Sequence, residues 1–82
     1  MNKKSKEILK NVYLSYNKGE ECFKMKTPIS SQIHDFNMAV KDLEGYITFV
    51  ERNIVNIKIA LTDKGLEYCI ENFFTLDSKK EL

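Results

Sequence analysis

The sequence contains few residues of the kinds that interrupt or cross-link a fold. Its 82 residues include one proline, three glycines, two cysteines and no tryptophan. So little proline and glycine excludes collagen-like, linker-rich and low-complexity chains. Cys22 and Cys69 lie far apart and in no metal-ligand spacing. We therefore expect a cytoplasmic protein in which both thiols are reduced.

An excess of charge of either sign is also lacking. Thirteen basic and twelve acidic residues leave a net charge of +1. Domains that bind DNA are often more basic, because neutralising phosphates supplies most of their non-specific affinity. A basic surface on this chain would have to come from uneven placement of the charges. Lys, Asn and Ile are abundant while Arg occurs once, a usage common in AT-rich bacterial, plasmid and phage genomes.

Membrane and catalytic signatures are missing as well. No apolar run approaches the about 20 residues of a membrane span, and Ile8-Leu9 is followed at once by Lys10, which excludes a signal core. His34 is the single histidine, and there is no Gly-rich phosphate loop or GxSxG string. We expect no enzymatic activity, no metal, no cofactor and no membrane partner.

The length and the 43% apolar content suit one small domain, which we place at residues 1–76 with a charged tail at 77–82. Residues 5–17 have a helical apolar period, and Ser5 is a candidate N-cap. The apolar positions of this stripe are Ile8, Leu9, Val12, Tyr13 and Tyr16.

The middle of the chain is harder to interpret. Residues 20–27 are ambiguous, since the partial alternation of Phe23 and Met25 is compatible with one short strand before Pro28 but does not require it. Residues 29–44 have a helical period, and Ser30 or Ser31 can cap the start. This segment is either one helix or two short helices with a turn near His34-Asp35, and the periodicity leaves both open.

The C-terminal half indicates a hairpin followed by a helix. Gly45 ends the helical pattern, and residues 46–50 and 55–61 have strand character on either side of a polar turn at 51–53. Thr62-Asp63 can cap a last helix whose apolar stripe runs from Leu66 to Phe74. The chain is therefore expected to be α+β.

Two stretches resemble the winged helix-turn-helix family. Val40-Lys41-Asp42-Leu43-Glu44-Gly45-Tyr46-Ile47 is similar to a recognition helix running into the first wing strand. Ile59-Ala60-Leu61-Thr62-Asp63-Lys64-Gly65-Leu66-Glu67-Tyr68 is similar to the second wing strand entering a closing helix. The resemblance is to small stand-alone bacterial, plasmid or phage members. It implies a three-helix core with a C-terminal β-hairpin wing followed by a closing helix.

The same resemblance implies that the chain binds double-stranded DNA, with the middle helix in the major groove and the wing on the backbone. Asn and Lys are suited to base edges, and a lone Arg to phosphates or the minor groove. The expected DNA-binding residues are Asn37 and Lys41 on the helix, Arg52 and Asn53 at the hairpin tip, and Lys3 and Lys4 at the N-terminus, with Lys24 and Lys26 as further phosphate contacts. A solvated face of mixed charge is the alternative, because Asp35, Asp42 and Glu44 would repel phosphates.

Apolar residues of the terminal helices are either core or a homodimer interface. The interface set comprises Tyr13, Tyr16, Ile70, Phe73 and Phe74. The expected role is a transcriptional regulator or a plasmid or phage accessory factor. The near-neutral charge favours a different role on the same scaffold. That alternative is a protein–protein interaction module, either an adaptor or a phage-encoded inhibitor of a host complex.

Overall fold

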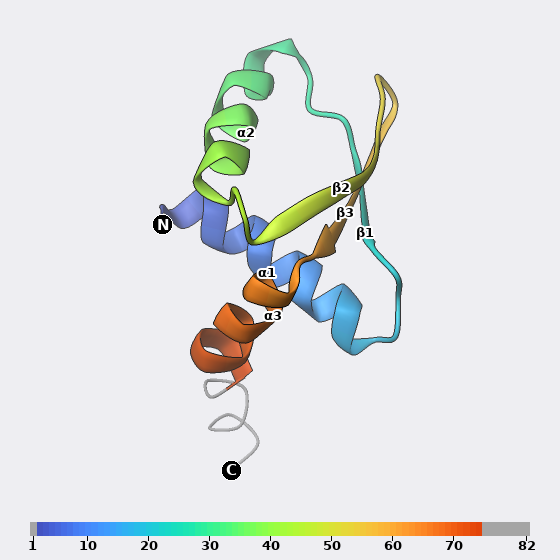
Figure 1. Cartoon of the computed structure of the whole chain (residues 1–82). Helices are drawn as coiled ribbons and strands as arrows, with labels where there is room; N and C mark the ends of the chain where they lie inside the picture. The colour runs from blue at the N-terminus through green and yellow to red at the C-terminus, as the bar shows by residue number, and fades with distance from the viewer. Residues whose placement is uncertain (1, 75–82) are drawn as a thin grey trace.

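The computed structural model describes residues 2–74, except for the side chains of Phe73 and Phe74. This part of the chain forms helices around a small antiparallel sheet, which confirms the α+β class (Figure 1). The elements are α1 (Lys3–Asn17), β1 (Phe23–Lys26), α2 (Ser30–Asp42), β2 (Ile47–Arg52), β3 (Asn56–Leu61), α3 (Asp63–Cys69) and a π-helical turn (Ile70–Phe74). The charged tail expected at 77–82 lies outside the described residues.

The sheet has the order β1-β3-β2, so β3 is the central strand. On one side β1 pairs with it antiparallel, with Phe23 opposite Ile59 and Met25 opposite Ile57. This settles the ambiguity of residues 20–27 in favour of one short strand. Ile57 and Ile59 are fully buried because successive side chains of a strand point to opposite faces, and both point to the covered face.

Helix α1 lies across the covered face of the sheet and also contacts α2 and α3. Its stripe of Ile8, Leu9, Val12 and Tyr13 is buried, as the periodicity predicts. The rest of the core comes from the other elements, chiefly Phe36, Ala39, Leu43, Ile47, Ile57, Ile59 and Cys69. Tyr16, at the end of the same stripe, is 51% exposed.

The N-cap of α1 is Asn2, and the prediction that Ser5 caps this helix is wrong. Asn2 has extended backbone geometry, and its side-chain oxygen accepts from the Ser5 backbone N–H at 2.8 Å. Ser5 is instead fully buried against α2, where its hydroxyl lies 2.9 Å from Asn2 Oδ1 and 3.3 Å from the Ala39 carbonyl. Its small size lets the two helices approach closely.

Helix α2 is one unbroken helix, which settles the alternative left open by the sequence. No turn interrupts it at His34-Asp35. Ile29 occupies the N-cap position without a side-chain hydrogen bond, so neither Ser30 nor Ser31 acts as the cap. Residues 30–42 therefore do not form a helix-turn-helix of two short arms.

The two stretches that resemble winged domains meet in one tertiary contact. The Thr62 hydroxyl accepts from the Gly65 N–H at 3.0 Å and donates to the Gly45 carbonyl at 2.7 Å. The backbone N–H of Thr62 donates to the Tyr46 carbonyl at 3.1 Å. Gly45 has a φ of +89°, a conformation that favours glycine. Thr62 thus caps α3, as predicted, and also ties it to the start of β2.

Gly65 allows this contact because a Cβ atom there would overlap the carbonyl oxygen of Tyr46. In an ordinary helix interior, alanine is favoured over glycine by about 1 kcal/mol. We expect the opposite sign at this position. Gly65→Ala should lower the free energy of unfolding by about 1–3 kcal/mol, because α3 must shift away from β2.

Urea denaturation of the purified protein measures this difference. Glu67→Ala, at an exposed position of the same helix, is the matched control and should change stability by less than about 0.5 kcal/mol. A Gly65→Ala protein as stable as the wild type would contradict the close approach.

Candidate nucleic-acid interface

Helix α2 and the β2–β3 hairpin lie beside each other and extend toward the same end of the molecule, whereas α3 lies at the opposite end (Figure 1). Phe36, Ala39 and Leu43 are buried. Asn37 and Lys41 are exposed, as predicted for the outward face of this helix. The exposed face of α2 and the hairpin therefore form the candidate ligand-binding surface.

The structure brings Arg52 of the hairpin and Asn37 of the helix together. The guanidinium donates to Asn37 Oδ1 at 2.7 Å. Its carbon Cζ lies 5.0 Å from the centre of the Phe49 ring and 5.7 Å from that of Phe36. Such cation–π contacts hold a guanidinium in place. Arg52 thus bridges the two elements from which the DNA-binding residues were predicted.

A β-bulge at Val50 produces this arrangement. Phe49 pairs with Ile59, but the next pair is Glu51 with Lys58, so Val50 is an extra residue in β2. A bulge of this kind reverses which face the following residues point to. Arg52 consequently lies opposite the buried Ile57, on the side facing α2.

The prediction of a polar turn at 51–53 is wrong, because Glu51 and Arg52 are paired with Lys58 and Ile57 of β3. Strand β2 continues to Arg52, so this residue is in the strand and not at the hairpin tip. Glu51 points to the open face of the sheet, where its carboxylate lies 3.7 Å from the Lys58 ammonium. The turn itself is Asn53-Ile54-Val55, which we call the hairpin tip.

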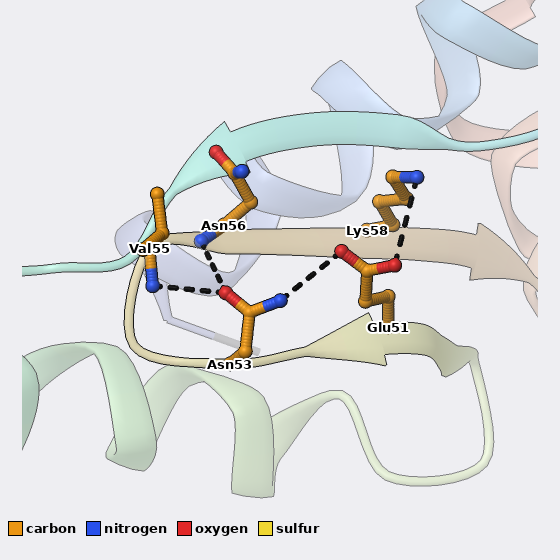
Figure 2. Close-up of polar contacts among 5 residues, drawn as sticks. All are labelled: Glu51, Asn53, Val55, Asn56 and Lys58. Atoms are coloured by element: carbon orange, nitrogen blue, oxygen red, sulfur yellow. Dashed lines mark hydrogen bonds and ion pairs between the residues drawn. The ribbon is translucent and has the colours of Figure 1, made fainter.

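Asn53 shapes the hairpin tip (Figure 2). Its Oδ1 accepts from the backbone N–H groups of Val55 at 2.9 Å and Asn56 at 2.8 Å. Its Nδ2 donates to Glu51 Oε2 at 3.2 Å. An asparagine that bonds its own backbone a few residues on is a common turn former. The Asn53 side chain is thus engaged in holding the turn, although the residue is exposed at the tip as expected.

The hairpin tip is also tied to the loop that follows β1. The Thr27 hydroxyl donates to the Asn53 carbonyl at 2.6 Å. The Thr27 backbone N–H donates to the Val55 carbonyl at 3.1 Å. The tip is therefore fixed both from within and from a neighbouring segment.

Lys3 and Lys4 are both exposed at the start of α1, but they face different surroundings. Lys4 lines a groove with Glu7 and Gln32, between α1 and the β1–α2 connection. Lys3 lies with Lys6 and Lys10 along a different stripe of α1. The structure therefore does not gather both lysines at one place beside Asn37 and Lys41.

Cations gather on the sheet and not on α2. Helix α2 contains Asp35, Lys41 and Asp42, whereas the strands contain Lys24, Lys26, Arg52 and Lys58 against the single acid Glu51. Lys24 and Lys58 are direct cross-strand partners, and both point to the open face of the sheet. Sequence reasoning missed Lys58, although its place between Ile57 and Ile59 marks the outward face of an alternating strand.

Of the predicted dimer residues, Tyr13 belongs to the core, since it is 2% exposed in the single chain. Tyr16 and Ile70 are 51% and 47% exposed, and they border a shallow groove together with Leu66. The side chains of Phe73 and Phe74 lie outside the described part of the chain. Of the predicted interface set, the described side chains that are exposed are therefore Tyr16 and Ile70.

Three further features were considered from the sequence for residues 2–74: a metal site, a reactive thiol and a membrane span. No group of three or more His, Cys, Asp or Glu side chains in this range is placed to hold a metal ion. Burial raises the pKa of the Cys69 thiol to about 12, so this core cysteine stays protonated near neutral pH. None of the helices in this range is both long and apolar enough to cross a membrane.

Comparison with known proteins adds no relative. No protein family, no curated protein and no solved structure matches the chain significantly.

Asp42 joins the end of α2 to the start of α1. Its Oδ2 accepts from the Asn2 backbone N–H at 2.8 Å. This hydrogen bond, and secondarily the Ser5 hydroxyl, lowers the pKa of the Asp42 carboxyl below its ordinary value of 3.8. A carboxyl whose pKa is lower in the folded state stabilises the fold above its unfolded pKa, and this contribution is lost as the pH falls through the folded pKa.

We expect Asp42→Asn to lower the free energy of unfolding at neutral pH. The difference from the wild type should shrink as the pH falls below 3.8, where the wild-type carboxyl becomes protonated as well. Urea denaturation at a series of pH values tests this. Asp35→Asn, which removes an exposed carboxylate from the same helix, controls for the change in charge. A gap of constant size across the pH range would show that the ionised Asp42 does not stabilise the fold.

Proposed function

We propose that this protein binds double-stranded DNA as a winged-helix domain, in the role of a transcriptional regulator or a plasmid or phage accessory factor. The observation that carries the proposal is the Arg52–Asn37 hydrogen bond, which makes α2 and the hairpin one continuous exposed surface. A helix of this length fits the major groove, and the adjacent hairpin would then lie along the backbone.

The bond to Arg52 also orients the Asn37 amide. A guanidinium only donates, so the Asn37 oxygen must face Arg52 and its Nδ2 group is left to donate elsewhere. Suitable acceptors in the major groove are guanine O6 and N7 or thymine O4. Lys41, one turn further along the exposed face, can donate to a base edge or to a phosphate. The 57%-exposed Met38 lies between them and offers an apolar contact.

The acids of α2 weaken this surface less than their number suggests. Asp42 is engaged by the Asn2 backbone N–H, at the end of the helix away from the hairpin tip. On the side of α2, the positive charge for phosphate binding comes from Arg52 and Lys41, whereas Lys24, Lys26 and Lys58 add positive charge on the opposite, open face of the sheet. Phosphate contacts from the hairpin and base contacts from α2 would divide positioning and specificity between the two elements.

A second candidate function is binding to another protein. It is favoured by the acidic balance of α2, whose exposed face also includes Met38. A partner with a basic, partly apolar groove would suit this helix. In this case the chain would serve as an adaptor or as an inhibitor of a larger complex.

Binding of an AT-rich duplex, followed by fluorescence anisotropy at several salt concentrations, distinguishes the two candidates. We expect affinity to fall with salt at a log–log slope of about −0.9 per phosphate contact. Lys41→Ala should reduce that slope by about one contact. Arg52→Ala should weaken binding at every salt concentration, because it removes both a cation and the orientation of Asn37.

Lys18→Ala is the matched control, since it removes an exposed lysine at the far end of α1. Thermal unfolding of each variant establishes that the fold is intact, which matters most for Arg52 because of its contacts with Phe36 and Phe49. Wild-type protein that does not bind the duplex would exclude the DNA proposal and favour a protein partner.

We further propose that two copies pair through the groove around Tyr16 and Ile70. Pairing would join two DNA-binding surfaces in one particle and would add to the affinity of a small module. Sedimentation velocity at micromolar concentration should show a dimer. Tyr16→Lys and Ile70→Lys should each shift it to monomer, whereas a monomeric wild type would contradict this arrangement.

A further inference from the structure

The hairpin tip exposes an isoleucine side chain to solvent. Ile54 is 93% exposed, the highest value among the large hydrophobic side chains described. Val50 and Val55 on the same hairpin are 61% and 63% exposed. Turns are normally built from Gly, Asn, Asp, Ser and Pro, and Asn53 already supplies the side-chain bonds of this turn. The fold therefore gives no reason for an apolar residue at position 54.

The tip that holds Ile54 is rigid. Asn53 bonds the two residues that follow Ile54, and its backbone N–H donates to the Asn56 carbonyl at 3.0 Å. Thr27 bonds the carbonyls on either side of Ile54, those of Asn53 and Val55. A turn whose backbone is held in this way loses little further backbone entropy when a ligand covers it.

Cations flank the tip on both faces of the hairpin. Arg52 lies on the face toward α2, opposite Ile57. Lys26 and Lys58 lie on the open face, with Lys26 opposite Asn56 at the base of the tip, and they outnumber the one acid beside them, Glu51, which pairs with Lys58. An apolar side chain with cations on both sides of it is complementary to a narrow groove that has phosphates along both walls. The minor groove of DNA, about 6 Å wide, has this character.

We propose that Ile54 is an apolar wedge, which enters the minor groove, partly unstacks one base step and kinks the duplex. This inference rests on the proposed DNA binding and adds to it a specific contact and a deformation of the DNA. Arg52 on one side and Lys26 and Lys58 on the other bind the phosphates of the two strands. Flexible pyrimidine–purine steps such as TA are the preferred sites, because they unstack at the lowest cost.

The test compares Ile54→Thr with Val50→Thr. Threonine keeps the branched shape but adds a hydroxyl, and both positions are exposed, so neither change should alter thermal stability. An AT-rich duplex carries a donor and an acceptor dye at its ends, and a second duplex carries 2-aminopurine at a central TA step. Wild type should shorten the end-to-end distance and raise the 2-aminopurine fluorescence. Ile54→Thr should abolish both signals and weaken binding about tenfold, the effect of exposing one buried aliphatic side chain.

Val50→Thr should behave as the wild type, because Val50 is in the bulge and not at the tip. If wild type and Ile54→Thr bind the duplex equally and neither kinks it, the wedge is excluded while DNA binding stands. If both kink it equally, Ile54 is not the wedge. If the wild type does not bind the duplex at any salt concentration, the wedge and the proposed function are both wrong.

Discussion

The close contact between α3 and the backbone at Tyr46 is the constraint on which the rest of the structure depends. Thr62 bonds both Gly45 and Tyr46, and Gly65 leaves no side chain between the two segments. The contact closes a loop that contains the whole hairpin, so it sets where β2 leaves α2 and where β3 enters α3. The rings of Tyr46 and Tyr68, with centres 5.3 Å apart, and the Lys64 ammonium 5.0 Å from the Tyr46 ring pack around the same point.

With its base held in this way, the hairpin can extend beside α2 as a defined arm. The core under it is completed by α1, which contacts strands β1 and β3 and both other helices. The apolar core and the candidate nucleic-acid surface therefore lie in different parts of the molecule. The apolar contacts gather around α1, whereas the polar and cationic side chains that suit a nucleic acid lie on α2, the hairpin and the open face of the sheet.

Much of the fold could be predicted because its signals are local. The stripe of α1, the alternation of β3, the cap at Thr62 and the turn at Gly45 each arise from a few neighbouring residues, and all are present. The site was predicted less well. Asn37 and Lys41 face outward as expected, but Arg52 is paired within β2 and not at the tip, and the bulge at Val50 turns it toward α2. No local pattern marks a bulge, since its register depends on the pairing of two strands. The clustering of lysines on the sheet likewise needs the pairing of β1 with β3, which are far apart in the chain.

The pairing at the bulge decides to which face of the hairpin each following side chain of β2 points. With Val50 unpaired, Arg52 faces α2 and Glu51 faces the lysines. If Val50 were paired with Lys58 instead, simple alternation would place Glu51 opposite Ile57 and Arg52 opposite Asn56, so the acid would face α2 and the arginine would join the lysines. Deleting Val50 would not have this effect, because Phe49, Glu51 and Arg52 would then alternate with their present partners and keep their present faces. A lineage could therefore lose the bulge together with its extra residue and still keep the distribution of charge between the two faces.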